Sequence, residues 1–133
     1  MMSPPLVQDR RSEVEARRVI EAYFPLFNSG DPARLLTVIH FPHIRVASGT
    51  TRIIASEAEW TGDPTPLDPA ERWHRSALDA VEFLQSGADK VHARVVFSRY
   101  RADGTRYVTY EALWVVTRLQ GKWGIQVRSS FAP

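Results

Sequence analysis

The strongest pattern in this 133-residue chain lies in residues 90–130, which read KVHARVVFSRYRADGTRYVTYEALWVVTRLQGKWGIQVRSS. Apolar and polar residues alternate here with a period of two, which is typical of strands with one buried face. Asp103-Gly104 and Gln120-Gly121 interrupt the alternation, and both pairs suit tight turns. The pattern therefore predicts a meander of three antiparallel strands.

The two turns also predict which residues of the meander lie opposite one another. A two-residue turn at Asp103-Gly104 places Arg94 opposite Leu113. A tight turn at Gln120-Gly121 then places Glu111 diagonal to Arg128, within reach of long side chains. We therefore expect an ion pair between Glu111 and Arg128, with Arg94 one register step away.

In this register, one face of the meander is strongly apolar and the other is mixed. A contiguous apolar face of this size is rarely left in water by a soluble monomer, so it must be covered. Either the helices cover it, or a second subunit covers it while the helices close over the mixed face around a pocket. The apolar face carries Val91, Ala93, Val95, Phe97, Val108, Tyr110, Ala112, Trp114, Val116, Trp123, Ile125 and Val127.

The residues before the meander predict helices. Ser12 and Glu15 form a capping box in front of an apolar stripe that ends at Gly30. Pro25 removes a backbone donor, so we expect a kink there or an early end of the helix. Residues 1–11 are expected to be a flexible leader.

Two further Asp-Pro pairs have the pattern of a helix N-cap followed by the first helical residue. Asp31-Pro32 predicts a short second helix that ends near His40. Two short strands are expected around a bend within residues 44–55. Asp68-Pro69 predicts a third helix, because apolar residues follow at helical spacing up to Gly87.

Length and composition indicate a single globular α+β domain over residues 12–133. The chain has 17 Lys and Arg against 15 Asp and Glu, and it has no Cys. Because the basic residues are scattered, we expect no nucleic-acid binding. No run approaches the roughly 20 apolar residues of a membrane span, and the N-terminus lacks the apolar core of a signal peptide. We therefore expect a soluble, cytoplasmic protein that does not bind membranes.

Four stretches resemble the nuclear transport factor 2-like (NTF2-like) superfamily, which includes SnoaL-like polyketide cyclases and ketosteroid isomerases. The resemblance implies a cone-shaped fold in which a curved antiparallel sheet wraps around N-terminal helices and encloses a pocket. It also implies a homodimer through the outer sheet face, which favours burial of the apolar face by a second subunit. The stretches are YFPLFNSGDPARLLTV (23–38), FPHIRVASG (41–49), WHRS (73–76) and GKWGIQVRSSFAP (121–133).

The chain departs from the ketosteroid isomerases at the position of their acidic base. That base precedes a glycine that resembles Gly49, but residues 46–48 are Val, Ala and Ser. Without a carboxylate there, we do not expect steroid-type isomerisation. Tyr23 lies seven residues before Gly30, at the spacing of the isomerase tyrosine, and it also belongs to the apolar stripe. Tyr23 is therefore a candidate for hydrogen bonding to a ligand or for the core.

Three histidines are candidates for acid-base chemistry near neutral pH. His40 and His43 flank Phe41-Pro42, and each could line a pocket or cap a loop. His74 follows Trp73, so we expect one of this pair to face inward. No further ligand follows at a recognisable interval, so we expect no metal, and no motif indicates a cofactor.

Two functions remain open at this stage. The first is a dimeric domain that binds a small organic molecule in a pocket. Such a domain could be a binding protein, or it could also carry out SnoaL-like chemistry on that molecule. Its catalytic candidates are His43 and His74, and its ligand-binding candidates are Tyr23, His40, Trp73, Arg94, Glu111 and Arg128. The alternative is a non-catalytic dimeric interaction module that works through the sheet face of Trp114, Ile125 and Val127.

Overall fold

The computed structural model describes residues 8–62 and 69–132. Within these residues, two α-helices and a six-stranded sheet make up the fold. The helices are α1 (Arg10–Asn28) and α2 (Pro32–Leu35), and η1 (Glu57–Glu59) is one turn of 3-10 helix. The strands are β1 (Ile39–Ala47), β2 (Thr50–Ile54), β3 (Trp73–Ser86), β4 (Lys90–Arg101), β5 (Arg106–Leu119) and β6 (Lys122–Ser130).

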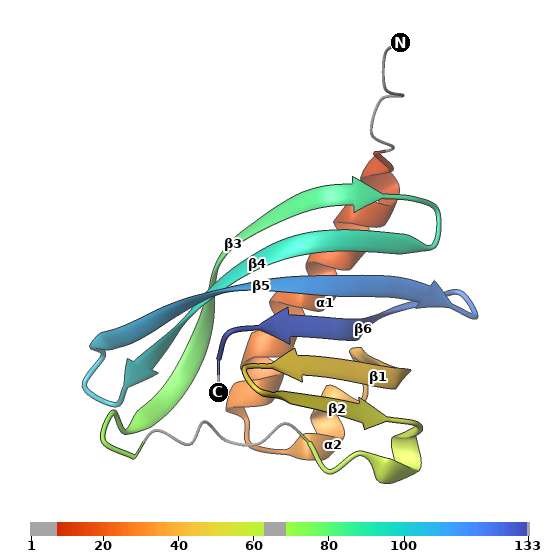
Figure 1. The fold of residues 1–133 in the computed structure, drawn as a ribbon. Coiled ribbons are helices and arrows are strands. Elements are labelled where there is room, and N and C mark those ends of the chain that lie inside the picture. The colour runs from red at the N-terminus through yellow and green to blue at the C-terminus, as the bar shows by residue number, and fades with distance from the viewer. Residues whose placement is uncertain (1–7, 63–68, 133) are drawn as a thin grey trace.

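The sheet has the strand order β2-β1-β6-β5-β4-β3. Neighbouring strands are antiparallel except for β1 and β6, which run parallel. Figure 1 shows the long strands β3, β4 and β5 bending around α1, which lies along one face of the sheet. The expected α+β fold, with an N-terminal helix packed in a curved sheet, is confirmed, although one strand pair is not antiparallel.

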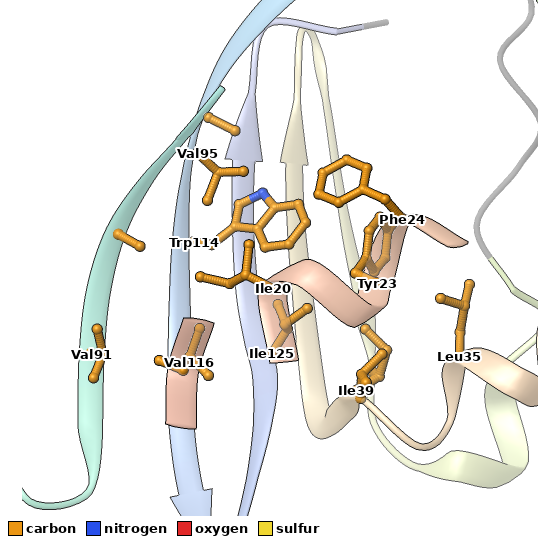
Figure 2. Close-up of a cluster of buried hydrophobic side chains, with 14 residues drawn as sticks. Ile20, Tyr23, Phe24, Leu35, Ile39, Val91, Val95, Trp114, Val116 and Ile125 are labelled. Atoms are coloured by element: carbon orange, nitrogen blue, oxygen red, sulfur yellow. The ribbon is translucent and has the colours of Figure 1, made fainter. Parts of the chain in front are cut away.

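The helix α1 covers the apolar face of the meander. Val95, Trp114 and Ile125 are buried against it, and Figure 2 shows Tyr23 and Phe24 of α1 beside Trp114. Burying one such side chain is worth about 1.5–3 kcal/mol, so this contact dominates the core. The expectation that a second subunit covers this face is therefore wrong. The interaction surface expected at Trp114 and Ile125 is wrong for the same reason, because α1 already occupies it.

The expected third helix is wrong, because these residues form the strand β3. Pairing with β4 extends along the whole strand from Trp73 to Ser86. Three register shifts interrupt the alternation of its side chains, so the apolar residues fall at spacings that imitate a helix. Residues 63–68, including the expected N-cap Asp68, lie outside the described residues. Tertiary pairing here overrides the local helix propensity.

The ends of the two helices also differ from the sequence prediction. Asp9 is the N-cap of α1 and accepts a hydrogen bond from the Ser12 N–H over 3.0 Å, so the helix begins before Ser12. Pro25 lies inside α1, which continues to Asn28, and Gly30 follows at a φ of 75°. Asp31 caps α2 as expected, but α2 ends at Leu35. Of the expected leader, residues 1–7 lie outside the described part of the chain.

The two hairpins of the meander differ in register. The pairs between β4 and β5 follow the prediction, with Arg94 opposite Leu113. Between β5 and β6 the register shifts, because Gln126 is an extra residue between the pairs Val116–Ile125 and Val115–Val127. Arg128 therefore lies opposite Trp114, on the face that α1 covers. The predicted pair of Glu111 with Arg128 is wrong because of this single bulge.

Candidate functional site

A partly enclosed cavity of about 60 Å³ lies between α1 and the sheet. Three arginines, Arg45, Arg99 and Arg128, line it and give it the name arginine pocket. Its apolar wall consists of aromatic side chains, and hydroxyl groups complete the polar part. The further lining residues are Tyr23, Phe24, Phe27, Ser76, Phe97, Trp114, Ser130 and Ala132.

Arg128 is the most constrained of the three arginines. It is 7% exposed, and its Nη1 donates a hydrogen bond to the Tyr23 hydroxyl over 2.7 Å. Its Nε donates to Nε2 of His43 over 3.1 Å. A buried guanidinium is costly unless its donors are matched, and these two contacts from α1 and β1 supply matching acceptors. Together they fix the orientation of the planar guanidinium at the pocket wall.

His43 is completely buried behind Arg128. Its Nδ1 bonds the Ile125 carbonyl oxygen over 3.0 Å, so Nδ1 carries a proton. Its Nε2 accepts from Arg128 and therefore carries none, which makes the imidazole neutral in this arrangement. Trp60 packs edge-on against the ring, with the two ring centroids 6.0 Å apart. His43 does not line the pocket itself.

Arg45 and Arg99 are the two pocket arginines that sequence reasoning missed. Arg45 follows His43 on β1 with one residue between, and its Cα pairs with that of Arg128 on β6. Arg99 is 7% exposed, and its guanidinium carbon lies 4.9 Å from the ring centroid of Tyr110. The alternation of β4 could have found Arg99, because it continues the inward row that contains Phe97.

Arg94 and Glu111 lie on the outer face of the sheet, away from the pocket. Nη2 of Arg94 donates to the Glu111 carboxylate over 2.5 Å. The Glu82 carboxylate oxygen Oε2 lies 3.7 Å from Nη1 of the same arginine. The hydrogen bond and the charge of Glu111 raise the pKa of Arg94. These two predicted ligand-binding residues therefore form an exposed ion pair on the protein surface and do not contribute to the pocket.

The remaining candidates lie outside the arginine pocket. His74 is exposed on β3. The Trp73 indole N–H donates to the Ser76 hydroxyl over 3.0 Å, and its ring packs edge-on against Phe27. His40 is buried on β1, where Nδ1 bonds the Thr117 hydroxyl over 3.0 Å. Of the predicted site residues, the structure thus places Tyr23 and Arg128 in the pocket, with His43 behind them.

His40 occupies space that only a glycine leaves open. A Cβ atom at Gly124 of β6 would come within 2.6 Å of the His40 ring. Burial, followed by the nearby Lys122 cation, lowers the pKa of His40. The ring is therefore held neutral at a packed position that does not line the pocket.

The charge of the arginine pocket distinguishes it from a second hollow near the start of α1. Its described lining includes three arginines and no acidic side chain. A larger surface hollow of about 440 Å³ near the start of α1 has Arg11 and Arg118 together with Asp9 and Glu15, so its charge is balanced. Within residues 8–62 and 69–132, no cluster of His, Asp and Glu could hold a metal. No helix in the same residues is long and apolar enough to cross a membrane.

Comparisons with known proteins identify the fold. No family model and no curated protein matches the sequence. Among solved structures, an NTF2-like protein with a cystatin-like fold from Novosphingobium aromaticivorans has a TM-score of 0.65 at 19% identity, covering 92% of this chain and 82% of its own. A Nostoc punctiforme protein of unknown function with a cystatin-like fold has a TM-score of 0.72 at 9% identity, covering 96% of both chains. An NTF2-like protein of unknown function from Pseudomonas putida has a TM-score of 0.69 at 16% identity, covering 94% of this chain and 89% of its own.

The chain therefore has the NTF2-like fold, also described as cystatin-like. This confirms at the level of fold the resemblance seen in the sequence. The identities are all below 20%, so the likeness concerns architecture alone. Because one fold supports unrelated functions, a function must be argued from the arginine pocket.

Proposed function

We propose that this protein binds a small organic anion in the arginine pocket. The observation that carries the proposal is the convergence of Arg45, Arg99 and Arg128 on one cavity with an aromatic wall. Like charges that gather in a partly buried site repel one another, and a bound anion relieves that repulsion. The arginine guanidinium also matches the planar, two-oxygen geometry of a carboxylate.

The rest of the lining supports an organic ligand. Phe97 and Trp114 offer apolar contact, while Ser76 and Ser130 offer hydroxyl groups. Ligand sites commonly combine such an apolar wall with a few well-placed polar groups. The pocket therefore suits a molecule with a charged head and an apolar body.

The proposed role is binding without an assigned catalytic step. Both ring nitrogens of His43 are engaged, one with the Ile125 carbonyl and one with Arg128. His74 is exposed on β3 and does not line the pocket. A general acid or base must reach the ligand directly or through one water, and neither histidine has that position in the arginine pocket.

A thermal-shift comparison of charged and neutral ligands tests this role. We expect small carboxylates to raise the melting temperature by mass action, while the corresponding amides leave it unchanged. Arg45→Gln should weaken this stabilisation, whereas Arg94→Gln on the outer face should not. Equal stabilisation by a carboxylate and its amide would contradict the proposal.

We also propose that the protein forms a homodimer through the outer face of the sheet. This face exposes large apolar side chains, with exposed fractions of 54% for Leu113, 38% for Val46 and 69% for Ile53. Arg94 and Glu111, which lie beside Leu113 on the same face, offer both signs of charge to a second copy. Sedimentation should show a dimer for the wild type and a monomer for Leu113→Lys. A wild-type monomer at every concentration would rule the dimer out.

A further inference from the structure

The aromatic rings around the arginine pocket pack against one another and leave little space for a ligand. Phe24 stacks on Trp114, with ring centroids 5.8 Å apart and an interplanar angle of 9°. Tyr23 stacks on Phe27 at 5.8 Å and meets Trp114 edge-on at 5.0 Å. Figure 2 shows Tyr23 and Phe24 of α1 beside Trp114. These rings of the pocket wall therefore already pack against one another, and a ligand ring would have to displace one of them to stack in its place.

The size of the cavity limits the part of a ligand that it can enclose. The pocket has a volume of about 60 Å³. A cavity of about 150 Å³ holds one benzene molecule, which corresponds to about 25 Å³ for each carbon. By this measure the enclosed space holds about two to three non-hydrogen atoms, which is the size of a carboxylate group. Because the cavity is only partly enclosed, one or two further carbons fit at its mouth.

The lining favours a carboxylate over an inorganic oxyanion. A short carboxylate has its charge at one end and carbon at the other. It can direct its oxygens at Arg45 and Arg128 while its carbon contacts the aromatic wall. A tetrahedral oxyanion has charge on every side, so it would press oxygen against the negative faces of the rings. The combination of arginine donors and an aromatic wall therefore favours a ligand with charge at one end and carbon at the other.

We propose that the ligand is a short-chain monocarboxylate of about three to five non-hydrogen atoms, which is the range from formate to propionate. This inference rests on the proposed function, because it specifies the class of anion that the same pocket binds. It excludes fused-ring and single-ring acids as ligands of this conformation. Each extra carbon beyond the mouth meets either the packed rings or open water, so affinity should stop rising at this size.

The test is a titration of the ¹⁵N-labelled protein, followed by amide and indole chemical shifts at constant ionic strength. The probes are sodium formate, acetate, propionate and benzoate, with sodium chloride as the reference salt. We expect saturable shifts with acetate and propionate, and at least tenfold weaker binding of benzoate. Arg45→Gln should weaken acetate binding at least tenfold, whereas Arg94→Gln should leave it unchanged.

The possible outcomes separate this inference from the proposed function. Tighter binding of benzoate than of acetate would overturn the size limit and leave the anion pocket standing. Saturation by chloride at the same concentration as acetate would overturn the choice of a carboxylate. No saturable shift with any of the carboxylates, in a protein with a well-dispersed spectrum, would overturn both the inference and the proposed function.

Discussion

The two halves of strand β6 each hold one buried histidine of β1, but the two contacts differ in chemistry. Before the bulge at Gln126, Gly124 makes room for the ring of His40. After the bulge, Arg128 donates a hydrogen bond to the ring of His43. His40 bonds the neutral hydroxyl of Thr117, whereas His43 accepts its hydrogen bond from a cation that lines the pocket.

This difference shows that the two histidines have different roles. His40 is structural, whereas His43 supports a residue of the pocket. The His40 contact fills space and is sensitive to shape. The His43 contact supports a guanidinium, so it is sensitive to hydrogen-bonding geometry and charge. Neither ring lines the arginine pocket, which means that a histidine can serve a site from behind its charged residue.

Arg128→Ala should be the most destabilising change to these contacts. It removes the guanidinium that donates hydrogen bonds to both Tyr23 and His43, and each such buried hydrogen bond that is lost costs about 1–3 kcal/mol. We therefore expect the free energy of unfolding, measured by urea denaturation, to fall by about 3 kcal/mol. Arg94→Ala on the outer face is the matched control and should barely move the midpoint. Equal losses in both variants would contradict the contrast between the two faces.

Gly124→Ala tests the shape-sensitive half of β6. The new methyl group would meet the His40 ring at 2.6 Å, and overpacking of this kind costs about 1–3 kcal/mol. The double variant His40→Ala/Gly124→Ala should recover part of that loss, because the ring that clashes is gone. Urea unfolding of both single variants and the double variant gives the coupling energy. Purely additive losses would show that the two residues do not share this space.

Much of the fold followed from the sequence because local patterns and long-range pairing agree there. The alternation from Val91 to Phe97 has its inward side chains buried as a strand should, apart from a partly buried Phe97. The apolar stripe of α1 and the N-cap Asp31 likewise need only neighbouring residues to be recognised. In β3 the bulges disturb the period, so only pairing with β4 reveals the strand.

The candidate site was harder to predict because one inserted residue changes the face of everything after it. Gln126 leaves no signal in composition, yet it turns Arg128 toward Trp114 and away from Glu111. The sequence suggests Tyr23 and Arg128 separately as ligand-binding candidates, but only the fold brings them into contact, because that contact joins α1 to the last strand. Arg45 lies in a parallel pairing of β1 with β6 that no turn specifies. Such contacts between distant segments are set by the whole fold.

His43→Leu and His43→Gln together test whether Arg128 needs an acceptor behind it. Leucine removes the acceptor for Arg128 and the donor to Ile125, so we expect a loss of about 2 kcal/mol in unfolding free energy. Glutamine offers an amide NH2 group as donor and a carbonyl oxygen as acceptor on a side chain of similar length, so it should restore more than half of that loss. The affinity for acetate should follow the same order, with the wild type binding most tightly, the glutamine variant less tightly and the leucine variant least tightly. A glutamine variant no better than leucine would mean that His43 contributes only packing.

The smallest expected effect is the acid sensitivity that His40 confers. Its pKa lies below the ordinary value of 6.5 because of burial and then the Lys122 charge. Below pH 6.5 the unfolded chain therefore binds a proton at His40 that the folded chain does not bind. As the pH falls from 6.5 to the lowered folded pKa of His40, the unfolding free energy should fall by at most about 1.4 kcal/mol per pH unit.

His40→Gln should lose less stability than wild type between pH 7.5 and pH 5.5, as measured by urea unfolding at both values. Lys122→Met should also lose less, because removing the cation brings the folded pKa of His40 closer to its ordinary value. If His40→Gln declined as steeply as wild type, other groups would account for the acid sensitivity, and the neutral packing assigned to the first half of β6 would be wrong.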